Sequence, residues 1–282
     1  MYPAGRRATG SSPRQTRQSR AWGQNFLVQP AVAEKIVSAA TLKPGDEVVE
    51  IGPGKGALTE CLTRRALSRL LLIEIDPELA ELARRRFGAG PRVEVAAADF
   101  LQLDLASVLG RPPVKLVGNL PFSSAAAILR RVSARPELIT RMVLMFQKEV
   151  AARVRARPGD AGYAALSVFC ALWWQIIDHF AVGAGNFWPR PRVDAEVLVM
   201  EPRPPESWAA GRRALIEGVV SGAFFLRRKL LRNSLAAYYG AAPAAVERAL
   251  ELAELPARGR AQELARADFL RLAAAVERVG LA

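Results

Sequence analysis

The residue types best suited to chemistry in this sequence are an amide, a proline and an aromatic ring that occur together. They are Asn119, Leu120, Pro121 and Phe122. The segment follows an apolar run, 114–117, that predicts a buried parallel strand, and the proline forces a turn at the carboxyl end of that strand, where open α/β sheets bind ligands. An adenine or cytosine amino group needs hydrogen-bond acceptors and a stacking surface, and this segment supplies both. A strand that ends in an ordinary turn with a buried Phe122 fits the same residues.

A glycine-rich loop, Gly-Pro-Gly-Lys-Gly at 52–56, lies between a predicted strand at 47–51 and a predicted helix at 57–65. A strand, a glycine loop and a helix N-terminus form a typical anion- or nucleotide-binding turn. The G-x-G-x-G spacing differs from that of the dinucleotide folds and of the Walker loop. With Glu50 before it, the loop resembles the E-x-G-x-G-x-G loop of S-adenosylmethionine-dependent methyltransferases.

Carboxylates follow the next two predicted strands. Glu74 lies near the end of a strand at 70–75, about twenty residues past the glycine loop, the position from which a carboxylate binds ribose hydroxyls. Asp99 follows a strand at 93–96 and precedes Phe100, so the pair suits the amino group and the face of an adenine ring. Asp76 is better interpreted as the N-cap of the next helix. Glycine loop, Glu74 and Asp99 at successive strand ends predict a nucleotide site.

Two basic segments carry the types of residue that nucleic acids require. The first is a proline-rich loop with Phe187, Arg190 and Arg192, in which an aromatic ring could stack on a base while arginines pair with phosphates. An apolar hairpin corner fixed by prolines is the alternative. The second segment is predicted to begin a helix with four cations on little more than one turn. These are Arg227, Arg228, Lys229 and Arg232.

Composition agrees with a nucleic-acid partner. The chain has 282 residues, a formal net charge of +13 and a sequence pI near 10.7, a field that attracts polyanions. Its two cysteines match neither a disulfide framework nor a metal site, and its one histidine, His179, excludes a His-pair zinc site. We expect His179 to be a partly buried strand residue. No segment predicts a signal peptide or a membrane span, so we expect a cytoplasmic protein without membrane contact or bound metal.

These elements predict an α/β fold, a Rossmann-like methyltransferase sheet with helices on both faces, followed by a small all-α domain. The expected domains are a flexible basic arm at 1–21, the methyltransferase domain at 22–203 and a helical RNA-binding domain at 204–282. The other expected strands are 141–147 and 174–182. The other expected helices are one through 32–40, one that opens at 148–150, and those at 77–87, 125–132, 163–171, 214–225, 244–252 and 266–279.

Taken together and in order, the motifs resemble the ribosomal RNA adenine N6-dimethyltransferase family, of the bacterial small-subunit (16S) type. The matching segments are 23–27, 50–56, 74–76, Asp99, 119–122, 147–150, 187–194, 227–235 and 268–270. The resemblance implies that a set of pocket residues binds the cofactor S-adenosylmethionine: Asn25, Leu27, Gly52, Gly54, Glu74, Asp99 and Asn119. It also implies that Asn119 and the Leu120 carbonyl hold the adenine amino group, with Phe122 and Phe187 stacking on the ring.

The implied activity is methyl transfer to the N6 atoms of two adjacent adenosines near the 3′ end of 16S ribosomal RNA, giving N6,N6-dimethyladenosine during ribosome biogenesis. The implied partner is an immature small subunit, and we expect a monomer. A large-subunit (23S) methyltransferase of the macrolide-resistance type shares the core motifs, but the Gln-Lys-Glu-Val run at 147–150 and the long helical C-terminus favour the small-subunit enzyme. The remaining alternatives are an RNA-binding assembly factor with secondary catalysis and a DNA adenine methyltransferase.

Overall fold

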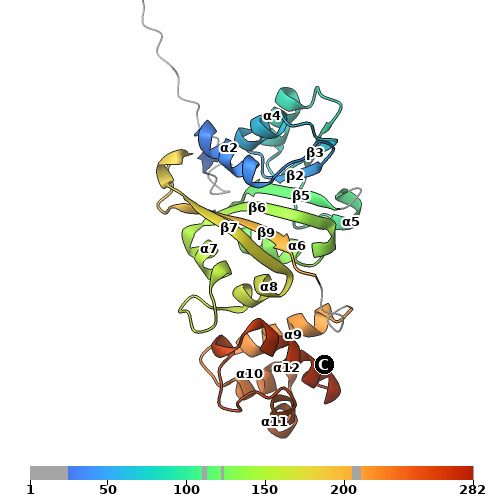
Figure 1. Cartoon of the computed structure of the whole chain (residues 1–282), viewed down its shortest axis with the longest axis vertical. Coiled ribbons are helices and arrows are strands. Elements are labelled where there is room, and N and C mark those ends of the chain that lie inside the picture. The colour runs from blue at the N-terminus through green and yellow to red at the C-terminus, as the bar shows by residue number, and fades with distance from the viewer. Residues whose placement is uncertain (1–24, 110–112, 122–123, 205–210, 282) are drawn as a thin grey trace, which may run out of the picture.

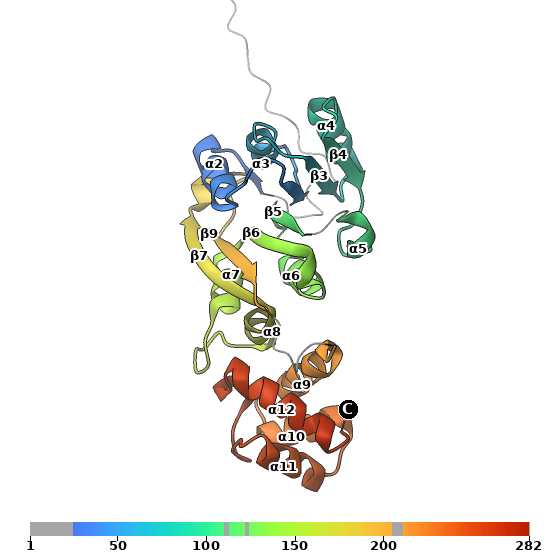
Figure 2. The ribbon, with the colours of Figure 1, turned by 45° about the vertical axis from the view of Figure 1, so that its right-hand side comes forward.

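The computed structural model describes residues 25–109, 113–121, 124–204 and 211–281. Its centre is a seven-stranded sheet with the order β4-β3-β2-β5-β6-β9-β7 (Figures 1 and 2). The first five strands in that order are parallel, whereas β9 is antiparallel to both β6 and β7. The strands are β2 Glu47–Ile51, β3 Arg69–Glu74, β4 Val93–Ala97, β5 Val114–Asn119, β6 Ile139–Gln147, β7 Trp174–Val182 and β9 Ala195–Pro202. The predicted fold class is confirmed.

Helices cover both faces of the sheet, because successive strand residues point to opposite sides. Val48 and Leu70 pack in one buried cluster with the helices on their side, and their neighbours Val49 and Leu71 pack in another. The face with Val48 and Leu70 is covered by α2, and the opposite face, with Val49 and Leu71, is covered by α6 (Figures 1 and 2). The helices of this region are α2 Pro30–Ala39, α3 Ala57–Leu62, α4 Pro77–Phe87, α5 Leu105–Val108, α6 Ala125–Val132, α7 Lys148–Arg155 and α8 Ala165–Trp173.

A glycine fixes how closely β2 and β5 approach. Gly118 lies opposite Ile51 in the parallel register. A Cβ atom at Gly118 would lie 2.9 Å from the Ile51 carbonyl oxygen, too close for any side chain. This contact is one residue before Asn119, so it determines where the end of β5 lies relative to the glycine loop that follows β2.

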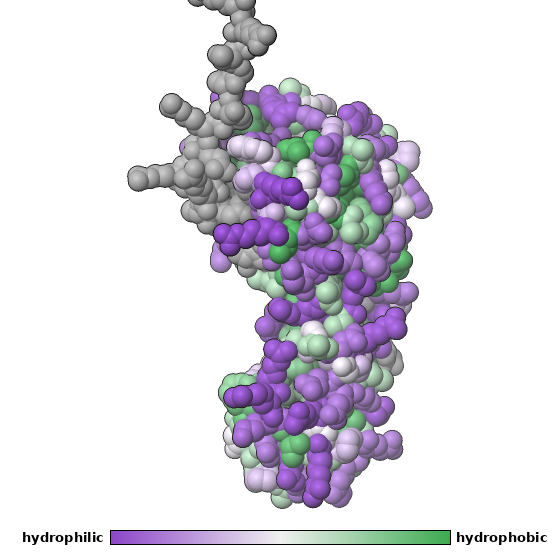
Figure 3. All heavy atoms as spheres, turned by 90° about the vertical axis from the view of Figure 1, so that its left-hand side faces the viewer, coloured by the Kyte–Doolittle hydropathy of each residue, from purple (hydrophilic) through white to green (hydrophobic). Residues whose placement is uncertain are grey.

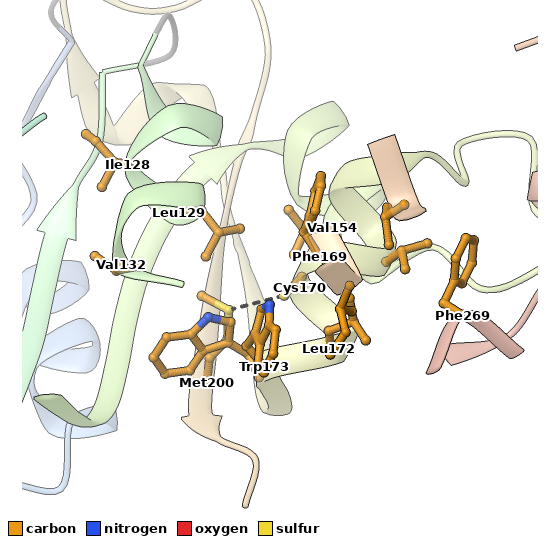
Figure 4. Close-up of a cluster of buried hydrophobic side chains, with 14 of the residues drawn as sticks. Ile128, Leu129, Val132, Val154, Phe169, Cys170, Leu172, Trp173, Met200 and Phe269 are labelled. Atoms are coloured by element: carbon orange, nitrogen blue, oxygen red, sulfur yellow. Dashed lines mark hydrogen bonds between the residues drawn. The ribbon is translucent and has the colours of Figure 1, made fainter. Parts of the chain in front are cut away.

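The C-terminal helices pack directly against α8 at the lower end of the molecule in Figure 1. Phe169, Leu172 and Trp173 of α8 lie in the same buried cluster as Phe269 of the C-terminal region, as Figure 4 shows. The Arg213 guanidinium lies 4.2 Å from the centroid of the Trp173 ring. These helices are α9 Arg213–Phe225, α10 Leu231–Tyr239, α11 Pro243–Leu252 and α12 Arg266–Arg278. Apolar packing therefore continues from the sheet into the helical region.

Several predicted elements have the predicted bounds, and others differ for local reasons. The strands at 47–51 and 174–182 and the helices at 77–87 and 125–132 are confirmed as predicted. The helix after the glycine loop ends at Leu62. The helix predicted at 163–171 is α8, which begins at Ala165, and its start is fixed by the Ala164 N–H, which donates to Ser167 Oγ at 3.1 Å.

Two predictions about single segments were wrong. His179 lies on β7 as expected, but its side chain is exposed and its Nδ1 lies 2.9 Å from Glu196 Oε1. The helix predicted to begin at the basic segment begins only at Leu231, because the Leu226 N–H donates to Ser234 Oγ and forms a turn before it. The N-terminal arm, Phe122 and part of the predicted interdomain linker lie outside the described residues, and the domain bounds remain a prediction. No helix among the described residues is long and apolar enough to cross a membrane.

Candidate active site

A pocket opens at the carboxyl ends of the parallel strands, and its lining contains every described residue that the sequence predicted for cofactor or catalysis. Those residues are Asn25, Leu27, Gly52, Gly54, Glu74, Asp99, Asn119, Leu120 and Pro121. They come from the last residues of β3 and β5, from the segments that follow β2, β4 and β5, and from the start of the described chain. Phe122, predicted to stack on a base, lies outside the described residues.

The glycine loop follows β2 and needs backbone angles that favour glycine. Gly52 has φ +67° and Gly54 has φ +55°. A Cβ atom at Gly54 would lie 3.1 Å from Cδ1 of Phe26, which packs over the loop. A larger residue at either position would therefore strain the loop or fill the space beside it. Because both positions are glycine, the loop backbone stays open to the pocket.

Glu74 holds the glycine loop in place. Its Oε2 accepts the Gly54 N–H at 3.0 Å, and its Oε1 accepts the Asp76 N–H at 3.0 Å. Burial raises the pKa of the Glu74 carboxyl, and these two N–H donors partly offset that rise. Each oxygen retains a lone pair, so the carboxylate can also accept hydrogen bonds from two neighbouring hydroxyl groups in the pocket.

Glu50 has a role that the sequence motif did not reveal. Its side chain is 1% exposed, and Oε2 accepts the Thr59 hydroxyl at 2.7 Å. Burial raises the pKa of Glu50 to about 8. The carboxyl is therefore mostly protonated at pH 7, so Glu50 connects the end of β2 to α3 without adding a negative charge to the pocket.

Asp99 follows β4 and lies half-buried in the pocket wall. Its Oδ1 accepts the Leu101 N–H at 2.9 Å, which fixes the turn, and no hydrogen bond from a described residue occupies the other carboxylate oxygen, Oδ2. Phe100 also lines the pocket, but only 4% of its surface is exposed because the ring packs in the core. The pair thus provides a hydrogen-bond acceptor and the edge of an apolar wall.

Asn119 is the last residue of β5, and the structure orients its amide. Nδ2 donates to the Asn25 carbonyl at 3.2 Å, and Oδ1 accepts no hydrogen bond from the described residues, so it can accept one from a ligand. Leu120 is buried, and its N–H donates to the Met145 carbonyl at 3.3 Å. The Pro121 carbonyl accepts the N–H groups of Ser124 and Ala125 at the start of α6. The segment is therefore fixed at both ends.

A two-stranded sheet that the sequence did not predict closes one side of the pocket. β1 Phe26–Leu27 pairs antiparallel with β8 Phe187–Trp188, with Phe26 opposite Trp188. Leu27 and Phe187 share a buried cluster, and Phe187 is only 4% exposed. The stacking of Phe187 on a base stays a prediction, and the structure shows its ring packed beside Leu27. The neighbouring Trp188 is 41% exposed.

Most of the predicted RNA-binding cations are exposed, but one of them already pairs with a carboxylate of the protein. Arg190 and Arg192 are exposed in the loop after β8. Three further exposed cations form a basic turn between α9 and α10, comprising Arg227, Arg228 and Lys229. Arg232, predicted as the fourth, is half-buried and pairs with Glu247 at 3.1 Å. Figure 3 shows one face of the molecule, on which hydrophilic side chains cover much of the upper part, which holds the sheet, and of the lower part, which holds the C-terminal helices.

An exposed aromatic pair beside the basic turn was missed by the sequence analysis. Phe225 is 56% exposed and Tyr238 is 40% exposed, and their ring centroids lie 5.7 Å apart with the edge of one ring toward the other. The signal available in the sequence was Phe225 itself, an aromatic residue directly before a run of cations.

Comparisons with known proteins agree on one family. The family model described as ribosomal RNA adenine dimethylase matches residues 15–276. The protein named ribosomal RNA small subunit methyltransferase A from Acidothermus cellulolyticus is 40% identical over 274 residues, which cover 95% of this chain and 91% of that protein. The protein of the same name from Geobacter metallireducens is 39% identical over 222 residues, which cover 78% of this chain and 80% of the relative.

Solved structures give the same fold. A dimethyladenosine transferase from Plasmodium falciparum superposes with a TM-score of 0.73 at 24% identity, covering 90% of this chain and 98% of that one. The 23S rRNA methyltransferase ErmE superposes with a TM-score of 0.64 at 28% identity, covering 90% of this chain and 100% of that one. The first likeness, at its low identity, is evidence for the fold only.

Proposed function

Because this chain belongs to the ribosomal RNA adenine dimethylase family, we propose that it methylates the small-subunit RNA. The reaction is transfer of methyl groups from S-adenosylmethionine to the N6 atoms of two adjacent adenosines near the 3′ end of 16S ribosomal RNA. The observation that carries the proposal is the pocket, in which Asn119 and Leu120 lie beside the glycine loop, Glu74 and Asp99. The names of the curated relatives support the choice of subunit.

The donor set of the pocket fits S-adenosylmethionine. Carboxylates suit the ribose hydroxyls and the adenine amino group, and they come from Glu74 and Asp99 on neighbouring strands. The open backbone at Gly52 and Gly54 leaves room for a ligand to pass close to the loop. Asn25 and Leu27 border the same space from the β1 side. When bound, this cofactor supplies a methyl group that is already activated by its sulfonium centre.

The protein's own work is then to position the adenine. The target base must leave its stack to reach a pocket at a strand end. Its exocyclic nitrogen is a poor nucleophile, because the lone pair is delocalised into the ring. Hydrogen-bond acceptors at Asn119 Oδ1 and the Leu120 carbonyl favour the pyramidal amine that attacks, so these contacts strengthen in the transition state. Holding the reacting atoms in line supplies much of the rate.

The protein also contacts RNA outside the pocket that holds the target adenine. An immature small ribosomal subunit is the partner that the proposed reaction requires, and the protein acts on it as a cytoplasmic monomer. Strand β8 pairs with β1, which borders the pocket, and this pairing supports a role for the exposed Arg190 and Arg192 of the next loop in contacting phosphates near the target. The basic turn contacts RNA phosphates from the helical region.

The basic turn should contribute a measurable part of the salt dependence of RNA binding. Replacing Arg227, Arg228 and Lys229 together by alanine should reduce the slope of log K against log salt by roughly 2–3, since each lost phosphate contact contributes about 0.7–0.9. Adding Arg232→Ala to the triple variant should change the slope by less than the loss of any one of the other three cations does, because Arg232 already pairs with Glu247. Filter binding across a salt series measures the slope.

Arg85→Ala is the matched control for one lost charge, because Arg85 is exposed on α4, outside the helical region. Its slope should stay that of the wild type. A triple variant whose slope also equals that of the wild type would show that the basic turn does not face RNA.

The reaction product tests the proposed function directly. The protein should be incubated with S-adenosylmethionine and each separated ribosomal subunit, followed by primer extension. Dimethylation removes the Watson–Crick donor of adenine and halts reverse transcription, so we expect stops at two adjacent adenosines near the 3′ end of 16S RNA. Stops confined to 23S RNA would assign the chain to the large-subunit enzymes, whose fold it shares. The absence of stops on both RNAs would refute the activity.

A further inference from the structure

Lys55, inside the glycine loop, is the only basic residue among the described residues that line the pocket. The other charged groups of the lining are acids, Glu50, Glu74 and Asp99. Glu50 is mostly neutral at pH 7, since burial raises its pKa to about 8. Among the described lining residues Lys55 is therefore the one that carries a positive charge. The sequence motif gives its position no role, because any residue can stand between the glycines.

Two aromatic rings hold the Lys55 ammonium in place. Its Nζ lies 4.7 Å from the centroid of Phe26 and 4.8 Å from that of Trp188, which are paired residues of β1 and β8. At the other end of the residue, the Lys55 carbonyl accepts Arg86 Nη1 at 2.7 Å. Contact with ring faces is electrostatic, and an ammonium has three N–H donors, so at least one donor can still bind an acceptor. The side chain is thus positioned without an ion pair to any carboxylate in the part of the chain that the structure describes.

The strand order indicates which part of the cofactor meets Lys55. Along the edge of the sheet, Asp99 follows β4, Glu74 ends β3, the glycine loop follows β2 and Asn119 ends β5. If the adenine lies at Asp99 and the ribose at Glu74, the methyl-bearing sulfur lies toward Asn119. The amino-acid end then lies by the glycine loop and β1. That end carries a carboxylate, and Lys55 is the cation beside it.

We propose that Lys55 binds the carboxylate of S-adenosylmethionine, held in position by the rings of Phe26 and Trp188. The assignment rests on the proposed function and specifies how the site recognises the amino-acid end of its cofactor. It explains why a lysine on a surface loop packs between two aromatic rings instead of extending into solvent. It also gives the pairing of β1 with β8 a function, since both rings belong to that small sheet.

Decarboxylated S-adenosylmethionine separates this role from a structural one, because it lacks only the group that Lys55 is proposed to bind. Lys55→Met keeps an unbranched side chain of similar length between the rings. We expect it to weaken S-adenosylmethionine binding about tenfold by calorimetry, near the lower end of what a hydrogen bond to a charged group contributes. Its affinity for the decarboxylated ligand should stay within about twofold of wild type. Lys55→Arg should retain most of the affinity for the intact cofactor.

Lys35→Met is the matched control. Lys35 makes the same kind of contact, with Nζ 4.1 Å from the centroid of Phe180, but it does not line the pocket. Its loss should leave both affinities unchanged. Thermal unfolding of each variant checks that the fold is retained.

Two results would overturn the assignment. An equal loss of affinity for both ligands in Lys55→Met would mean that the lysine only braces β1 and β8 against the loop, and unchanged affinity for both would mean that it is not a ligand contact. Failure of the wild-type protein to bind either ligand is a different result, because it would refute the proposed function and the assignment together.

Discussion

Asn119→Ala should lower the methylation rate by about 10²–10³ while RNA and cofactor still bind, because one preorganised transition-state hydrogen bond of this kind is typically worth that much. The acceptor Oδ1 is lost, and the adenine amine keeps only the Leu120 carbonyl. The contact to the Asn25 carbonyl at 3.2 Å is lost as well, but it lies in the ground state and should affect affinity far less than turnover. Single-turnover methylation of small subunits, with separate RNA and cofactor titrations, measures the two effects.

Gln175→Ala is a suitable control, since it also replaces an amide by a methyl group. Gln175 is exposed on β7, at the far edge of the sheet from the glycine loop. It should methylate at the wild-type rate. Undiminished turnover in Asn119→Ala would refute the proposed role of the amide, whereas loss of RNA binding in step with turnover would assign Asn119 to substrate binding alone.

Glu74→Ala should weaken S-adenosylmethionine binding by about 1–3 kcal/mol, the range for losing hydrogen bonds to a charged group. Two causes act together in this variant. The acceptor for the ribose hydroxyls is removed, and the N–H groups of Gly54 and Asp76 lose the carboxylate that fixes the loop. We therefore expect a lower melting temperature as well as a weaker affinity. Calorimetry and thermal unfolding measure the two.

The same carboxylate should make cofactor binding depend on pH. Since burial raises the pKa of Glu74, it should protonate at a higher pH than an exposed glutamate does. Acidification should therefore weaken binding before exposed carboxylates titrate, and Glu74→Ala should lose that part of the dependence. Glu78→Ala, at an exposed position on α4, should leave affinity and its pH dependence unchanged. Tight cofactor binding in Glu74→Ala would show that the ribose is held by other groups.

The sequence by itself determined the elements that carry the site, because their signals are local. Asp76 caps α4 by accepting the Glu78 N–H at 2.9 Å, as an aspartate directly before a proline predicts. The glycine loop has positive φ angles where the sequence has glycine. The rule that ligands bind at the carboxyl ends of parallel strands then placed Glu74, Asp99 and Asn119 in one pocket without any knowledge of distances.

Only the tertiary structure decided which side chains of the flanking segments face the ligand. β1 and β8 are short and far apart in the sequence, so their pairing has no local signal, and alternate residues of a strand point to opposite sides. A shift of one residue would exchange the buried Phe187 for the exposed Trp188, and no local signal in the sequence sets this register. Lys55 acquires its neighbours from that same pairing. Likewise, Arg232 is partly neutralised only because α10 packs on α11, which brings Glu247 to it.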